Sequence, residues 1–215
     1  MSGQVRGATM TGELTSEVEV LVRLSAAIGA GRSDERESAF RDALEHSRAA
    51  VEEALLQSHL FAGYPAAIAA LGRWRALAGA SGAEAGLEEG VDWAERGAAV
   101  CERVYGGQYG RLRANVAYLH PELERWMVRD GYGKVLGRPG LALAARELCV
   151  VALLCAQDAE PQLYSHMRGA LQVGCTEEQV ETVLEIAGRI VAPTNARAAR
   201  RVWAKVRQRT GSGRG

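Results

Sequence analysis

The sequence predicts an all-α fold, and three observations support this prediction. Apolar residues recur at helical spacing through most of the 215 residues. Runs of β-branched residues are nearly absent, which argues against an all-β fold. Capping residues and prolines stand where helices would begin, and glycines stand where they would end. Hydrophobic residues at 47% and charged residues at 24% are ordinary values for a globular protein.

Start and stop signals divide the first third of the chain into four helices. They are predicted to begin at Thr15 or Ser16, at Ser33 or Asp34, near Val51 and at Pro65. Gly63 ends the third helix, because glycine readily adopts the left-handed conformation found at helix C-termini. Pro65 opens the fourth helix, because its fixed φ and missing N–H suit a first helical turn.

The remaining helices follow a stretch rich in Gly, Ala and Glu at residues 79–90, which is predicted to be a linker. These helices are expected around Trp93–Val104, on both sides of His120–Pro121, from Leu141 to about Gln157, from Pro161, from Thr176 and from Pro193. The glycines between Gly131 and Gly140 predict a loop. The whole chain is therefore expected to be helical apart from its linkers.

Charge and composition exclude several classes of function. The chain has 26 Lys and Arg and 26 Asp and Glu, so it lacks the surplus positive charge of a nucleic-acid-binding protein. No apolar run approaches the ~20 residues of a membrane span. The first residues contain no apolar secretion signal, so we expect a cytoplasmic location and reduced thiols. The cysteines have neither CxxC nor metal-ligand spacing and are expected to be core residues: Cys101, Cys149, Cys155 and Cys175.

An internal repeat appears when the chain is shifted by 128 residues on itself. The identical pairs are Glu19/Glu147, Val22/Val150, Glu53/Glu181, Leu56/Leu184, Pro65/Pro193 and Arg73/Arg201. We interpret the repeat as a fused duplication, and the alternative is two unrelated Ala-rich helical stretches in coincidental phase. The predicted parts are a flexible tail (1–12), a degenerate N-terminal copy (13–79), a linker with a connecting helix (80–105) and a C-terminal copy (106–210).

Glu147 and His166 form the pair that best fits a catalytic site. They lie at about equal distances from the predicted turn at residues 156–160, so an antiparallel hairpin places them at the same height. A carboxylate beside an imidazole fixes its tautomer and stabilises its protonated form, which suits proton transfer. The alternative is a partly buried histidine paired with Glu147 for packing alone. In the first copy Ser38 takes the place of His166, so that copy is expected to be structural or to form an interface.

The arginines near this pair in the sequence are expected to have different roles. Arg138 lies in the predicted glycine-containing loop, where its guanidinium can clamp a carboxylate. Arg168 is two positions from His166 and therefore points to a different helix face, and Arg146 is expected to face solvent. Basic residues also accumulate after Glu185, either because the last helix complements its own dipole or because it makes a weak phosphate or partner contact.

Motifs in residues 119–200 resemble the carboxymuconolactone decarboxylase family of the alkylhydroperoxidase-D-like superfamily. The motifs are GYGKVLGRPGL, REL before an apolar helix, QLYSHMRGAL and G-x-T-E-E-Q-V-E-x-V-L. In the first half, EEALLQSHLFAGYPAAIAAL resembles the closing segment of the family, in which AGxPAA is typical. The second copy has VAPTN at that point, a departure from the family pattern that leaves the substrate open.

The resemblance implies a fold, an assembly and an activity. The fold would be the all-α alkylhydroperoxidase-D-like one, packed as trimers or hexamers, and a fused double chain would favour a trimer. The activity would be cofactor-independent decarboxylation of a small carboxylated lactone or a related aromatic-degradation intermediate, with neither metal nor organic cofactor. In this scheme Arg138 and Arg168 hold carboxylates, and His166, oriented by Glu147, donates the proton.

Two other functions are compared with the lyase, and one of them is disfavoured. Peroxidases of the superfamily use a CxxC pair, but Ala159 and Gln162 occupy those positions here, so thiol peroxidase chemistry is disfavoured. The main alternative to the lyase is a non-catalytic structural or regulatory homo-oligomer of the same fold. A homo-oligomer is expected in both cases, because four tryptophans exceed what one small core hides: Trp74, Trp93, Trp126 and Trp203.

Overall fold

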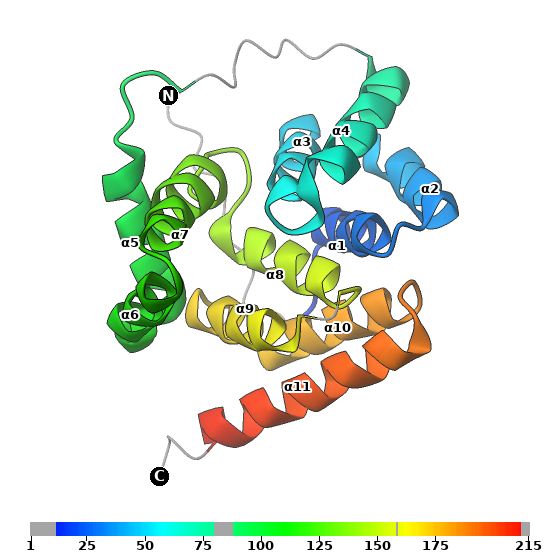
Figure 1. Cartoon of the computed structure of the whole chain (residues 1–215). Coiled ribbons are helices and arrows are strands. Elements are labelled where there is room, and N and C mark those ends of the chain that lie inside the picture. The colour runs from blue at the N-terminus through cyan, green and yellow to red at the C-terminus, as the bar shows by residue number, and fades with distance from the viewer. Residues whose placement is uncertain (1–11, 80–87, 158, 212–215) are drawn as a thin grey trace.

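The computed structural model describes residues 12–79, 88–157 and 159–211, and every regular element in these ranges is a helix (Figure 1). The predicted all-α fold class is therefore confirmed. The α-helices are α1 (Ser16–Gly29), α2 (Ser33–Ala43), α3 (Arg48–Gln57), α4 (His59–Ala78), α5 (Trp93–Tyr105), α6 (Tyr109–Leu119), α7 (Pro121–Trp126), α8 (Leu143–Leu154), α9 (Glu160–Gln172), α10 (Glu177–Gly188) and α11 (Pro193–Gly211). The short 3₁₀ helix η2 (Gly106–Gln108) and the π-helix η3 (Met127–Leu136) complete the described elements.

Helix α8 lies at the centre of the fold (Figure 1). All ten residues from Ala145 to Leu154 are buried, which explains why this helix is apolar nearly all round. One hydrophobic cluster joins α8 to α5, α9, α10 and α11, and a second cluster joins α1 to α4 and includes Cys149 of α8. The charged residues of α8, Arg146 and Glu147, are therefore placed in the interior.

Several predicted helix boundaries are confirmed by the hydrogen bonds that cap them. The Thr15 hydroxyl accepts from the amide of Val18 at 3.3 Å, and Thr176 forms a reciprocal capping box with Gln179. The third helix ends at Gln57, earlier than predicted, and Gly63, with a φ of 80°, instead kinks α4 two residues before Pro65. This left-handed conformation is the reason that a glycine stands there.

The predicted loop between Gly131 and Gly140 is wrong over its first half. Residues Met127–Leu136 form the π-helix η3, which continues from α7 and packs on α5. A Cβ at Gly133 would lie 1.9 Å from the carbonyl oxygen of Trp93, and one at Gly97 would lie 2.0 Å from that of Val128. These glycines serve close backbone packing rather than a turn, and the two roles look alike in a sequence.

We expect Gly133→Ala to destabilise the protein by about 1–3 kcal/mol, because the methyl group meets backbone that cannot move without separating α5 from η3. Chemical denaturation followed by circular dichroism measures the effect. Gly72→Ala in α4 is the matched control: nothing lies within 4 Å of its Cβ, so the helix should gain about 0.5–1 kcal/mol. Equal effects of the two substitutions would contradict this account of the α5–η3 contact.

Three helices of the first half begin, after a shift of 128 residues, within one residue of three helices of the second half. Shifting the starts of α1, α2 and α3 gives positions 144, 161 and 176, and α8, α9 and α10 begin at 143, 160 and 177. Pro65 corresponds to Pro193, where α11 begins. The duplication and its domain boundaries stay predictions. Residues 1–11 of the predicted tail and 80–87 of the predicted linker lie outside the described residues.

No single helix in the described ranges is both long and apolar enough to cross a membrane, whereas α3 and α4, which meet at 116°, satisfy the criteria of length and composition when taken together.

Candidate functional site

Glu147 and His166 meet in the interior between α8 and α9. His166 Nδ1 lies 2.9 Å from Glu147 Oε2. The Glu147 residue is fully buried, and 6% of His166 is exposed. The contact predicted from the spacing of the two residues around the hairpin turn is confirmed.

The surroundings of the pair fix its geometry. A Cβ at position 169 would lie 2.8 Å from Glu147 Oε2, so Gly169 leaves the space that the carboxylate occupies. The Phe61 ring stands edge-on to the imidazole, with ring centroids 5.3 Å apart. Because the carboxylate accepts at Nδ1, it favours the tautomer with its proton there. Within the described residues no group hydrogen-bonds to Nε2 of His166, so Nε2 is the ring atom available to a ligand.

The second carboxylate oxygen of Glu147 has an unusual environment. Oε1 is buried and has no hydrogen-bond partner within the described residues. Tyr105 and Tyr132 join their hydroxyls at 2.9 Å, and burial together with the negative charge of Glu147 raises the pKa of both. Burial and the same charge also raise the pKa of Cys101 to about 12. A buried carboxylate with an unsatisfied oxygen is costly, and such groups occur at functional sites.

Arg146 does not face solvent, so that prediction is wrong. Its side chain is completely buried, and Glu53 Oε2 accepts from its Nη2 at 2.8 Å. The other acceptors of its guanidinium are the side chain of Gln57 and the carbonyls of Arg138, Pro139 and Leu141. Desolvation lowers the pKa of Arg146, and the ion pair with Glu53 opposes that shift. The side chain thus ties α8 to α3.

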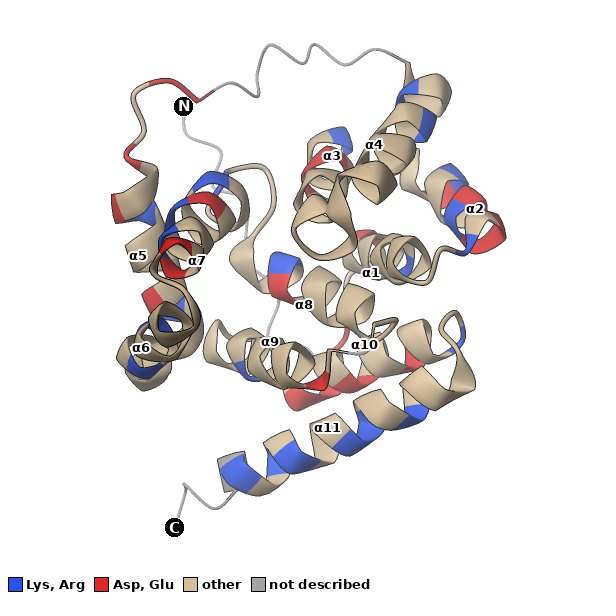
Figure 2. Cartoon of the chain, viewed as in Figure 1, with Lys and Arg blue, Asp and Glu red and all other residues tan. Residues whose placement is uncertain are grey.

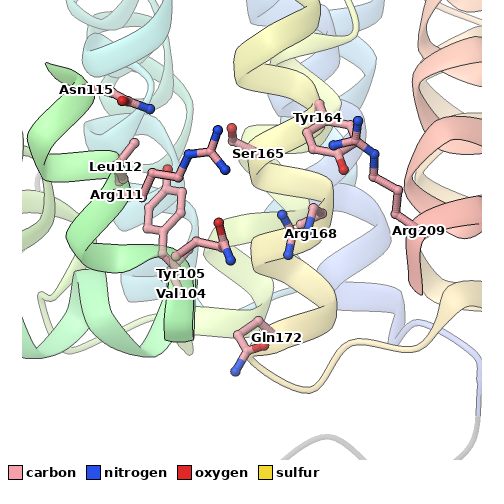
Figure 3. A pocket seen from close by; sticks show the side chains of 11 residues that line it. Val104, Tyr105, Arg111, Leu112, Asn115, Tyr164, Ser165, Arg168, Gln172 and Arg209 are labelled. Atoms are coloured by element: carbon pink, nitrogen blue, oxygen red, sulfur yellow. The ribbon is translucent and has the colours of Figure 1, made fainter. Parts of the chain in front are cut away.

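Arg138 and Arg168 lie in different parts of the molecule. Arg138 pairs with Glu53 at 3.0 Å and Glu88 at 3.6 Å, and it lines a cavity of about 580 Å³ between α4 and η3. Arg168 is exposed and lines a second cavity, of about 270 Å³ (Figure 3). His166 lines neither cavity. The structure therefore does not bring the two arginines together around His166, and their substrate-binding roles stay predictions.

The first half of the chain does not reproduce the Glu147–His166 contact. Glu19 is exposed on α1, and the Ser38 hydroxyl accepts from Arg23 at 3.0 Å. In the first half Ser38 therefore takes part in a surface contact with Arg23, whereas in the second half Glu147 and His166 form a buried pair.

All four cysteines are free and buried, as predicted. Burial raises the pKa of Cys149 to about 11 and that of Cys155 and Cys175 to about 12, so thiolates are scarce at neutral pH. Among the described residues, no three His, Cys, Asp or Glu side chains are grouped as a metal ion would require.

Replacing all four cysteines by alanine should leave any lyase activity within about tenfold, because protonated core thiols do not attack a substrate. Turnover per folded protein is the measurement, and the native protein should react slowly with a thiol reagent at pH 8. Loss of turnover in a well-folded single Cys→Ala variant would instead support thiol chemistry.

Comparisons with known proteins place the pair inside a recognised domain. The model of the carboxymuconolactone decarboxylase family matches residues 121–205. Peroxisomal protein 2 of Schizosaccharomyces pombe is 28% identical over 181 residues, which cover 78% of this chain and 82% of that protein. Peroxisomal protein 2 of Saccharomyces cerevisiae is 34% identical over 86 residues, which cover 39% of this chain and 30% of that protein.

Proposed function

Because residues 121–205 belong to the carboxymuconolactone decarboxylase family, we propose that the chain is a cofactor-independent carboxy-lyase. Its substrate would be a small carboxylated lactone or a related intermediate of aromatic degradation. The observation that carries the proposal is the 2.9 Å contact between Glu147 and His166, which leaves Nε2 without a protein partner among the described residues.

In the proposed reaction the bond between the carboxylate carbon and the lactone breaks, and CO₂ leaves. The electron pair stays on the substrate and is delocalised into the conjugated lactone carbonyl as an enolate. Protonated His166 then gives its Nε2 proton to the substrate carbon, and the neutral ring takes a proton from water. Glu147 stabilises the protonated ring before transfer and keeps it oriented afterwards.

The second candidate is a non-catalytic homo-oligomer of the same fold. It is favoured by the burial of His166, which is only 6% exposed and lines neither the α4–η3 cavity nor the cavity of Figure 3. A substrate would have to reach Nε2 through that small exposed edge.

Incubation of the purified protein with carboxylated lactones distinguishes the two candidates. For a lyase we expect a change in the ultraviolet absorbance of the conjugated lactone with matching release of CO₂, and both should disappear in a folded His166→Gln variant. If carboxylated lactones give neither an absorbance change nor CO₂ release, the result favours the non-catalytic oligomer.

A homo-oligomer, with a trimer favoured, is part of the proposal. Trp74 and Trp203 are buried within one chain, so only part of the tryptophan argument remains. Its stronger support is the α6–α7 surface, where Tyr118 is 90%, Leu119 71% and Trp126 56% exposed.

Light scattering should give three times the chain mass of 23.0 kDa, and Trp126→Glu should lower that mass because it places a charge on the exposed surface. Glu102→Gln on α5 is a control whose charge change lies outside the α6–α7 surface and should have no effect. A wild-type mass near 23 kDa would contradict assembly.

The cytoplasmic location also remains a proposal. Both yeast relatives bear the name Peroxisomal protein 2, which makes the peroxisome the alternative. Fractionation of the source cells with organelle markers decides between them.

A further inference from the structure

The cavity of Figure 3 brings together three arginines from three helices. Arg111 comes from α6, Arg168 from α9 and Arg209 from α11. Figure 3 shows Arg111 reaching toward α9 from one side and Arg209 reaching toward it from the other. The three residues are far apart in the sequence, which does not show that they converge.

The charge of this cavity is not balanced by the residues that line it. None of the lining side chains is acidic, and among the described residues none of the three arginines forms an ion pair. Figure 2 shows that basic residues run along α11 beside acidic residues of α10, and several of these do pair. Arg207 of α11 contacts Glu177 and Glu181 of α10. Glu160 of α9, which lines a separate cavity beside this one, contacts Arg201 and Lys205 of α11.

Tyr164 holds two of the arginines in place. The guanidinium carbons of Arg168 and Arg209 lie 5.9 and 5.8 Å from the centroid of its ring, within the range of a cation–π contact. Its hydroxyl oxygen is buried and has no hydrogen-bond partner in the described part of the chain. Tyr164 therefore contributes its ring, in contact with two of the arginines, to the wall of the cavity.

The neutral side chains of the cavity add to its capacity for oxyanions. Gln108, Asn115, Ser165 and Gln172 supply amide and hydroxyl donors. Arginine forks bind carboxylates and phosphates in a bidentate manner, and three of them around one cavity can engage more than one anionic group. The volume of about 270 Å³ suits a compact ligand.

From these observations we propose that the Arg111–Arg168–Arg209 cavity binds a small polyanion, a molecule with two or more carboxylate or phosphate groups. The site is separate from the Glu147–His166 pair, because α9 directs His166 into the core and Ser165 and Arg168 toward the cavity. The proposal therefore does not depend on the lyase function.

Isothermal titration of the full chain with citrate and with pyrophosphate tests the proposal, with acetate as a singly charged comparison. We expect saturable binding of citrate, pyrophosphate or both, and much weaker binding of acetate. Arg111→Gln and Arg209→Gln should each weaken binding about tenfold or more, since each removes a charged hydrogen-bond donor. The preferred ligand identifies carboxylate or phosphate as the source of the charge.

Arg200→Gln is the matched control, because Arg200 is exposed on the same helix as Arg209 but does not line the cavity. Its binding should equal that of the wild type, and binding should also persist in His166→Gln, which separates this proposal from the lyase. Circular dichroism checks that each exposed-arginine variant is folded. Absence of saturable binding to the wild type, or equal weakening by Arg200→Gln and Arg209→Gln, would overturn the proposal.

Discussion

His166→Gln should lower the turnover of a carboxylated lactone by about 10²–10⁴-fold, the usual range for loss of a general acid. Glutamine keeps much of the size of the imidazole and can still hydrogen-bond to Glu147, but it has no proton to donate near neutral pH. Steady-state rates per folded protein, with circular dichroism as the check on folding, give the measurement.

Two carboxylate variants sharpen this experiment. Glu147→Gln should cost less turnover than His166→Gln if the carboxylate orients the ring, which is 2.9 Å away. Glu19→Gln alters the repeat-related residue, which is exposed, and should leave turnover nearly unchanged. The reverse order, with Glu19→Gln inactive and His166→Gln active, would move the site to the junction of the two halves.

Arg146→Met should destabilise the protein by about 3–5 kcal/mol, because the completely buried guanidinium is one member of a largely buried ion-pair network with Glu53 and Arg138. Glu53 would lose its 2.8 Å contact and keep its pairing with Arg138, and the carbonyls of Arg138, Pro139 and Leu141 would lose a donor. Chemical denaturation gives the free energy of unfolding.

Arg73→Met is the matched control for this measurement. Arg73 pairs with Glu37 on the surface, with 43% and 30% of their side chains exposed, so solvent screens the pair and its loss should cost much less stability than the loss of Arg146. Equal costs for the two variants would show that the buried network around Arg146 contributes no more than a surface pair.

The sequence predicts a structural feature correctly where the contacts that determine it lie close together along the chain. Helix caps such as Thr176 act within one turn, and the Glu147–His166 contact follows from their distances to a single hairpin turn. Both depend on the fixed rise of a helix, so a count of residues along the chain predicts them.

Prediction failed where the deciding partner is distant in the chain. Arg146 is buried because Glu53, 93 residues earlier, lies opposite it. Gly133 is needed because the backbone of Trp93 approaches it. A charge or a glycine in one sequence does not show which distant segment it will meet.

Arg146 and Glu147 are consecutive residues of α8 that join different parts of the protein: the first contacts α3 and the second contacts α9. Truncation to the family-matched residues 121–205 would remove α3, which leaves the buried Arg146 in the first turn of α8 without the carboxylate of Glu53. It would also remove α1, which covers an apolar face of α8. The N-terminal half thus covers α8 and neutralises Arg146, so we expect the family-matched segment to need that half for its stability. We therefore expect a fragment cut at the limits of the family match to be less stable than the whole chain.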